Sequence, residues 1–181
     1  MRLGYNHHIM TDSKLILVTG ATGYVGGRLV PKLLEAGYRV RCLVRDPSRL
    51  EGRAWLHKVE VVKGDAVSKE GLAEVMHGVS TAYYLIHGKQ GGKLNAERDL
   101  QVARNFAHAA EEAGIDNIIY FGELVDPTAN LSPYLRARHE TGYLLRYGKV
   151  PVTEFRAGMI VGSGSALFEM IRYLTEREPL L

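Results

Sequence analysis

The amino-acid sequence predicts an α/β fold: a doubly wound parallel sheet of about six strands in the order 3-2-1-4-5-6, with helices on both faces. Three observations support this fold class. An apolar run at residues 15–18 stops at a glycine, and two more glycines follow at a spacing of three. Short apolar strand patterns and amphipathic helix patterns then alternate six times. The chain has 181 residues, of which 46% are hydrophobic and 24% charged, and this suits one domain with a sizeable core.

The first strand leads into a turn that favours an anion. Gly20 permits a tight turn, Gly23 lets a ligand approach the backbone, and Gly26 lets the next helix pack close to the strand. The free N–H groups in the first turn of that helix attract negative charge, and the pyrophosphate of a dinucleotide is a natural ligand. The sequence therefore predicts cofactor contacts for six residues of this turn: Gly20, Thr22, Gly23, Tyr24, Val25 and Gly26.

The later elements follow from the same patterns. The helix after the turn has apolar residues at 26, 29, 30, 33 and 34, contains Pro31, where we expect a slight kink, and ends at Gly37. Ser132 and Pro133 provide an N-cap and a proline at the first helical position for a later helix. Strands are predicted at 38–44, 59–63, 81–86, 117–121 and 151–157, helices at 47–57, 69–77, 94–113, 132–147 and 166–176, and a flexible loop at 88–93.

Composition excludes several function classes. The net charge is only +3 and no run of Lys or Arg occurs, so a nucleic-acid-binding module is disfavoured. The single cysteine, Cys42, excludes an internal disulfide and fits a reducing, cytoplasmic setting. No apolar stretch is long enough to span a membrane. Residues 1–13 are expected to form a flexible tail without a secretion signal, and His7 and His8 within it do not make a metal site.

The turn sequence T-G-A-T-G-Y-V-G at 19–26 resembles the short-chain dehydrogenase/reductase superfamily, in its extended and atypical branches, which have a Rossmann fold. L-V-R-D-P at 43–47 resembles NmrA-like and related atypical reductases, and Y-L-I-H at 84–87 looks like a bacterial group of NmrA-like and epimerase-like NAD(P)-binding proteins. The resemblance covers residues 14 to about 179 and implies a cofactor-binding domain at 14–181. Because extended members continue with further strands and helices that close the substrate pocket, we expect most of that part to be lacking here.

The end of the second strand decides which dinucleotide is preferred. An acidic residue there binds the ribose 2′-hydroxyl of NAD, whereas an arginine accommodates the 2′-phosphate of NADP. This chain has both, Arg45 and then Asp46, and Asp46 can instead cap the next helix. The resemblance implies that Arg45 meets the 2′-phosphate, so NADP(H) is the preferred cofactor and NAD(H) is the alternative. The alternative is that Arg45 is only an exposed residue at the end of the strand.

Five further residues are predicted to contact the cofactor. The resemblance implies that Asp65, after Gly64, contacts the adenine amino group with Ala66 beside it, although Gly-Asp also suits a plain turn. Leu85, Ile86 and His87 stand at the carboxyl end of a central strand, where ligands bind such sheets. For His87, cofactor lining and proton transfer are both open. Residues 156–164 either border the nicotinamide half of the cofactor or form a turn.

The catalytic signature of the superfamily is incomplete. Members use Ser, Tyr and Lys, the last two as Y-x-x-x-K, but this chain has Tyr134 and Arg138 at that spacing. The two lie on one helix face and are the candidate catalytic pair, although an arginine does not give up its proton at working pH. The serine position holds Gly122 and Glu123, neither of which has a hydroxyl. The alternative is that Tyr134 is a first-turn helix residue without a chemical role.

Two functions remain open. The first is an NADP(H)-binding oxidoreductase-like or epimerase-like protein that acts on an unknown small-molecule substrate. The second is a non-catalytic NADP(H)-sensing regulator or scaffold of NmrA-like type that acts through a protein partner, and the incomplete triad favours it. Either function is compatible with a homo-oligomer.

Overall fold

The computed structural model describes residues 13–86, 89–90, 93–94, 96–126 and 128–177. The predicted tail therefore lies outside the described residues except for Ser13, and so does His87. The elements in chain order are β1 (Leu15–Thr19), α1 (Tyr24–Glu35), β2 (Arg39–Val44), the 3₁₀ helices η1 (Pro47–Leu50) and η2 (Leu56–Lys58), β3 (Glu60–Lys63), α2 (Leu72–Met76), β4 (Val79–Tyr84), β5 (Lys89–Gln90), β6 (Lys93–Leu94), α3 (Ala96–Glu112), β7 (Asn117–Glu123), α4 (Pro133–Tyr147), β8 (Val152–Ala157) and α5 (Ala166–Arg177).

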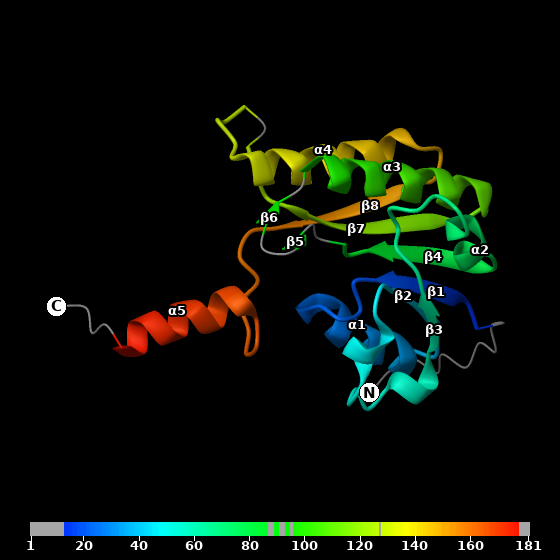
Figure 1. Cartoon of the computed structure of the whole chain (residues 1–181), viewed down its shortest axis with the longest axis horizontal. Coiled ribbons are helices and arrows are strands. Elements are labelled where there is room, and N and C mark those ends of the chain that lie inside the picture. Colours follow the sequence, from blue (N-terminus) through cyan, green and yellow to red (C-terminus); the bar gives the residue numbers. More distant parts are fainter. Residues whose placement is uncertain (1–12, 87–88, 91–92, 95, 127, 178–181) are drawn as a thin grey trace, which may run out of the picture.

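The main sheet has six parallel strands in the order β3-β2-β1-β4-β7-β8, which confirms the predicted topology (Figure 1). β1 lies in the middle, with Leu15 opposite Arg39 of β2 on one side and Val79 of β4 on the other. The strand order reverses at the β1–β4 boundary. In doubly wound sheets, ligands bind beside such a boundary at the carboxyl ends of the strands.

Two apolar clusters cover the two faces of the sheet. Because successive side chains of a strand point to opposite faces, Leu15 and Leu17 belong to one cluster and Ile16 and Val18 to the other. α2, α3 and α4 contribute to the larger cluster, and α1 and η1 contribute to the smaller one. All five residues of β1 are buried as a result. This explains why β1 is a continuous apolar run and does not alternate with polar residues.

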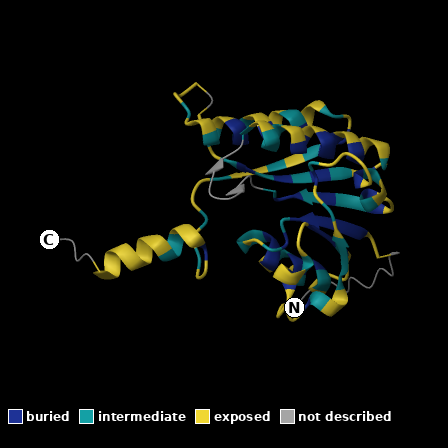
Figure 2. Cartoon of the chain, viewed as in Figure 1, coloured by how far each residue is buried: buried dark blue, intermediate teal, exposed yellow. Residues whose placement is uncertain are grey.

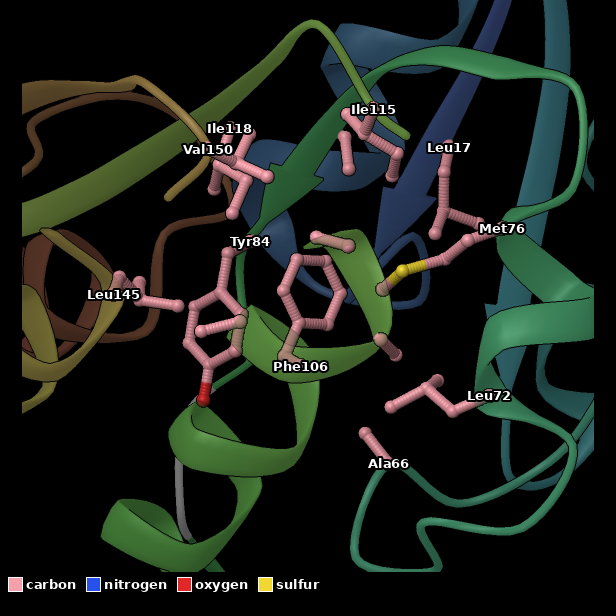
Figure 3. Packing of buried hydrophobic residues seen from close by; sticks show 14 of the residues in the cluster. Leu17, Ala66, Leu72, Met76, Tyr84, Phe106, Ile115, Ile118, Leu145 and Val150 are labelled. Carbon is pink, nitrogen blue, oxygen red and sulfur yellow. The ribbon is translucent and has the colours of Figure 1, made fainter. Parts of the chain in front are cut away.

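Aromatic rings form the centre of the larger cluster (Figure 3). The ring of Tyr84 meets Phe106 of α3 edge-on at 5.0 Å and Tyr120 of β7 at 5.8 Å between centroids. The Tyr120 hydroxyl donates a hydrogen bond of 2.9 Å to the Arg138 carbonyl, so this buried phenol is satisfied. These contacts fix α3 and α4 on the sheet near the carboxyl ends of β4 and β7.

Some predicted elements differ from the structure. The predicted helix at 47–57 is two short 3₁₀ helices, because Gly52 between them has a positive φ of +77°. The predicted helix at 69–77 is only Leu72–Met76, after Gly71 with φ +75°. The fourth strand starts and ends two residues earlier than predicted, and β5 and β6 form a two-residue antiparallel pair within the predicted loop. A pair this short leaves no periodic signal in a sequence.

The end of the chain packs less than the rest. None of the described residues of α5 is buried, and this helix projects away from the sheet (Figures 1 and 2). β8 is the edge strand of the main sheet, and its Phe155 is 56% exposed. Among the described residues, no helix combines the length and the apolar character that crossing a bilayer requires.

Candidate functional site

The glycine turn after β1 is packed against the end of β4. Gly20 has φ +72°, and a Cβ there would lie 2.5 Å from the carbonyl oxygen of Leu85. A Cβ on Gly26 would lie 2.3 Å from the carbonyl oxygen of Gly20, so α1 can approach the turn only because this residue lacks a side chain. Thr19 fixes the same junction, since its hydroxyl donates to the Tyr83 carbonyl at 2.9 Å and accepts from the Leu85 N–H at 3.1 Å. The turn and the end of β4 therefore form one rigid unit.

The first turn of α1 leaves donors for an anion. Its N-cap residue, Gly23, makes no side-chain capping bond, and the first turn contains no acidic residue. The first N–H groups of a helix have no partner within the helix, and they carry the positive end of its dipole. Gly23 is itself exposed and has no side chain above this turn. This end of α1 thus fits a phosphate group.

A cavity of about 580 Å³ lies at this edge of the sheet, beside the glycine turn. That volume is within the usual range for sites that bind small molecules and cofactors. Its lining comes from the ends of β1, β2, β3 and β4 and from α3: Gly20, Thr22, Gly23, Leu43, Val44, Arg45, Asp46, Arg49, Gly64, Asp65, Ala66, Leu85, Ile86, Arg98, Asp99 and Val102.

Eight of the predicted cofactor residues line this cavity: Gly20, Thr22, Gly23, Arg45, Asp65, Ala66, Leu85 and Ile86. Tyr24, Val25 and Gly26 do not line it. Val25 packs against the smaller apolar cluster, and the Tyr24 ring lies 3.7 Å from the Arg28 guanidinium, which donates a hydrogen bond of 2.6 Å to the Ser163 carbonyl. Tyr24 thus faces the segment after β8, where a Cβ on Gly162 would lie 2.2 Å from its hydroxyl.

Asp65 is held in place at the end of β3. One carboxylate oxygen accepts from the Val67 N–H at 3.1 Å, and the other accepts from Arg98 of α3 at 2.7 Å. The Asp65–Arg98 ion pair therefore connects the end of β3 with the start of α3 at the cavity. Sequence reasoning missed Arg98, because it lies 33 residues from Asp65 and in a different element.

Arg45 and Asp46 are used differently at the end of β2. Asp46 caps η1: the same carboxylate oxygen accepts from the Ser48 N–H at 3.1 Å and from its hydroxyl at 2.7 Å. These hydrogen bonds lower the pKa of Asp46. Arg45 and Arg49 both line the cavity and are exposed. Sequence reasoning missed Arg49, although its position four residues after Arg45 was a usable signal.

Tyr134 and Arg138 lie outside the cavity lining, and the structure brings them together with Glu123. Arg138 is only 4% exposed; its guanidinium donates to the Phe121 carbonyl and packs 5.2 Å from the centre of the Tyr120 ring. Its Nε lies 3.7 Å from the Glu123 carboxylate and has no hydrogen-bond partner among the described residues. The Tyr134 hydroxyl makes a long contact of 3.4 Å with the same carboxylate oxygen. The three side chains form one group at the carboxyl end of β7.

Burial raises the pKa of Tyr134; Arg138 opposes this shift, and Glu123 adds to it. Tyr134 is therefore a neutral phenol near neutral pH. A Cβ on neighbouring Gly122 would lie 2.6 Å from a carboxylate oxygen of Glu154, so a hydroxyl-bearing side chain there requires that carboxylate to move. Arg146 and Arg156 both pair with that carboxylate and hold it in place. The group at the end of β7 thus has a tyrosine but neither the serine nor the lysine of the superfamily triad.

Comparison with known proteins identifies a family that this chain matches. Residues 12–139 match the family model described as the NmrA-like family. The 3-beta-hydroxysteroid dehydrogenase of Mycolicibacterium neoaurum is 32% identical over 122 residues, which cover 62% of this chain and 32% of that protein. The photosystem II assembly factor Ycf39 of Cyanophora paradoxa is 28% identical over 144 residues, which cover 78% of this chain and 44% of that protein. This chain thus matches between about a third and a half of the length of these relatives.

Solved structures with a similar fold agree with the family match. The Citrobacter sp. triphenylmethane reductase, solved as a complex with NADP(H), superposes with a TM-score of 0.71 at 28% identity, covering 90% of this chain and 55% of that one. The family match and this neighbour both support a nicotinamide dinucleotide as the cofactor.

Proposed function

Because the chain belongs to the NmrA-like family of NAD(P)-binding, oxidoreductase-like proteins, we propose that it is a reductase that prefers NADP(H) to NAD(H). When bound, the nicotinamide supplies or accepts a hydride. The protein's own residues bind and orient the dinucleotide: the first turn of α1 holds the pyrophosphate, and Leu85 and Ile86 lie along the cofactor past the switch point of the sheet. Asp65, oriented by Arg98, accepts a hydrogen bond from the adenine amino group.

The arrangement at the end of β2 carries the proposed preference for NADP(H). A carboxylate that binds the ribose of NAD must accept hydrogen bonds from its hydroxyls, but one oxygen of Asp46 already accepts two hydrogen bonds from Ser48, which orients this carboxylate as the cap of η1. Arg45 and Arg49 both line the cavity, and two guanidinium groups there favour an additional phosphate. The cavity thus offers positive charge where NADP differs from NAD.

Titration of the protein with NADPH and NADH, followed by cofactor fluorescence, tests the preference. We expect tighter binding of NADPH and a selective loss of NADPH affinity in Arg45→Ala. The expected loss is about tenfold to a hundredfold, since a hydrogen bond to a charged group contributes roughly 1.5–3 kcal/mol. Arg136→Ala, which removes an exposed arginine from α4, is the matched control and should change neither affinity. Equal affinities of the parent for both cofactors would contradict the proposal.

A second function, a non-catalytic NADP(H)-responsive scaffold, is favoured by the group at the end of β7. Arg138 is buried and tied to a backbone carbonyl, so it does not stand free as the lysine of a working triad does. One relative is named for assembly of photosystem II. Oxidation of NADPH in the presence of a panel of aldehydes, ketones, quinones and organic cations distinguishes the two functions, because only a reductase consumes the cofactor.

A further inference from the structure

The segment that follows β8, residues 158–165, returns to the first turns of α1. The Arg28 guanidinium donates a hydrogen bond of 2.6 Å to the Ser163 carbonyl, and it lies 3.7 Å from the centre of the Tyr24 ring. The segment also touches this ring directly, since a Cβ on Gly162 would lie 2.2 Å from the Tyr24 hydroxyl. Two side chains one helical turn apart on α1 therefore anchor the 158–165 segment.

To reach α1, this segment passes the carboxyl ends of two strands. β7 and β4 lie between β8 and β1 in the sheet, and Ala157 at the end of β8 still accepts from the Leu124 N–H that follows β7. The spacing of neighbouring strands puts the ends of β8 and β1 about 14 Å apart, and the chain from Ala157 to Gly162 can span about 17 Å at most. The segment therefore runs close to the carboxyl edge of the sheet (Figure 1, orange).

Hydrogen bonds tie the segment to the start of α5. The buried Ser165 hydroxyl donates to the Ile160 carbonyl at 2.9 Å and accepts from the Phe168 N–H at 3.3 Å. The Glu169 carboxylate accepts from the Gly164 N–H at 2.8 Å. Because none of the described residues of α5 is buried, α5 itself gives the segment little support. The contacts with Tyr24 and Arg28 therefore have a large share in its position.

The path of the segment matters for one half of a dinucleotide. A cofactor whose pyrophosphate lies on the first turn of α1 continues past the end of β4 toward β7, which is where the segment crosses. The cavity for the other half is lined by sixteen residues, none of which belongs to the 158–165 segment. A segment that is already in place costs less to order when a ligand binds. Its anchoring thus favours the nicotinamide half and leaves the adenine half unaffected.

From these contacts we infer that Tyr24 and Arg28 are positioning residues for the cofactor. They hold the 158–165 segment across the carboxyl edge of the sheet, and the segment holds the nicotinamide half. Neither side chain needs to touch a reacting atom. The inference rests on the proposed NADP(H) function, because it concerns the same cofactor, and it adds residues on α1 that act through a distant part of the chain.

The test compares NADPH with 2′-phospho-ADP, which keeps the adenosine half and the pyrophosphate but lacks the nicotinamide riboside. By calorimetry we expect Arg28→Ala to bind NADPH about tenfold more weakly than the parent and to bind 2′-phospho-ADP with parental affinity. Arg28 is exposed, so this change leaves the core intact. Arg28→Lys keeps a donor for the Ser163 carbonyl and should restore part of the affinity. Lys32→Ala removes an exposed charge one turn further along α1 and is the matched control.

A second variant changes the same contact from the other side. Gly162→Ala places a Cβ against the Tyr24 hydroxyl and should show the same selective loss of NADPH affinity. A loss of both ligands in Arg28→Ala would identify Arg28 as a direct pyrophosphate ligand and overturn the inference. Parental NADPH affinity in both variants would overturn it as well. A parent that binds neither ligand would instead reject the proposed reductase.

Hydrogen exchange tests the anchoring without any cofactor. The Ser165 N–H donates to the Gly162 carbonyl at 3.0 Å, so its exchange reports local opening of the segment. In the cofactor-free protein we expect the peptide that contains residues 158–165 to exchange several times faster in Arg28→Ala than in the parent, and Lys32→Ala to match the parent. Equal exchange in Arg28→Ala and the parent would show that Arg28 does not anchor the segment.

Discussion

The two halves of the sheet differ in how completely the chain covers them. β1, near the glycine turn, is buried along its whole length between two apolar clusters, whereas β8 at the other edge alternates between half-buried and exposed residues. α5, which follows β8, has no buried residue among those the structure describes. The half that holds the cofactor cavity therefore gains its rigidity from its own core. The β8 edge and α5 instead present exposed apolar side chains, such as Phe155 and Leu174.

Replacing Phe106 by Ala gives the largest expected effect on this contrast. Phe106 is fully buried and packs edge-on against Tyr84 in the larger cluster. The loss of its ring should lower the free energy of unfolding by about 3–5 kcal/mol, measured by urea denaturation. A loss below about 1 kcal/mol would show that the cluster repacks and that the core is less rigid than its burial indicates.

A methyl group on Gly26 should have the next largest effect. Because the new Cβ would lie 2.3 Å from the Gly20 carbonyl oxygen, the backbone of the turn must shift, and we expect Gly26→Ala to cost about 1–3 kcal/mol of stability and to weaken cofactor binding. Gly23→Val is the matched variant. Its Cβ would lie 3.2 Å from the Gly20 carbonyl oxygen, a tight contact that a small shift relieves, so the variant should keep the fold but block the pyrophosphate. Parental NADPH affinity in Gly23→Val would refute the phosphate site on this turn.

Cys42 lies in β2, in the half of the sheet that holds the cofactor cavity, and its titration makes the free energy of unfolding depend on pH. Burial raises the pKa of the Cys42 thiol from its ordinary value of 9.0 to about 12. The folded state therefore keeps the thiol proton at pH values where the unfolded chain has lost it, so this contribution is complete below pH 9 and is lost as pH rises toward 12. At pH 10 the loss should be about 1.4 kcal/mol. The free energy of unfolding, measured by denaturation at several alkaline pH values, should fall less steeply with pH for Cys42→Ala than for the parent. The buried tyrosines titrate in both proteins, so the difference between the two slopes reports Cys42.

The smallest effect is expected for Leu174→Ala on α5. Leu174 is 51% exposed, so truncating it should change the free energy of unfolding by less than about 0.5 kcal/mol. A larger loss in urea denaturation would show that α5 packs in solution against a surface that this structure leaves open. The difference between the two halves would then be smaller than the burial of their residues suggests.

Most of the fold was predictable, because its signals are local. The apolar run of β1, the glycine spacing and the Ser132–Pro133 start of α4 each depend on neighbouring residues, and the alternation of elements then restricts the topology. The sequence also predicted eight of the residues that line the cavity. It also offered capping of the next helix as an alternative for Asp46, because that contact is local in the sequence. It did not predict that Arg98 would pair with Asp65, because this contact joins residues 33 positions apart. The burial of Arg138 behind Glu123 was inaccessible for the same reason.

The position of β1 in the sheet has a consequence for synthesis on the ribosome. β1 can pair with β2 soon after both emerge, but its other edge pairs with β4, which begins at Val79. At typical translation rates this edge waits on the order of several seconds for its partner. An unpaired strand edge invites pairing with other chains, and this one belongs to an uncharged apolar strand. The nascent chain is therefore most prone to aggregation in the interval between the emergence of the glycine turn and that of β4.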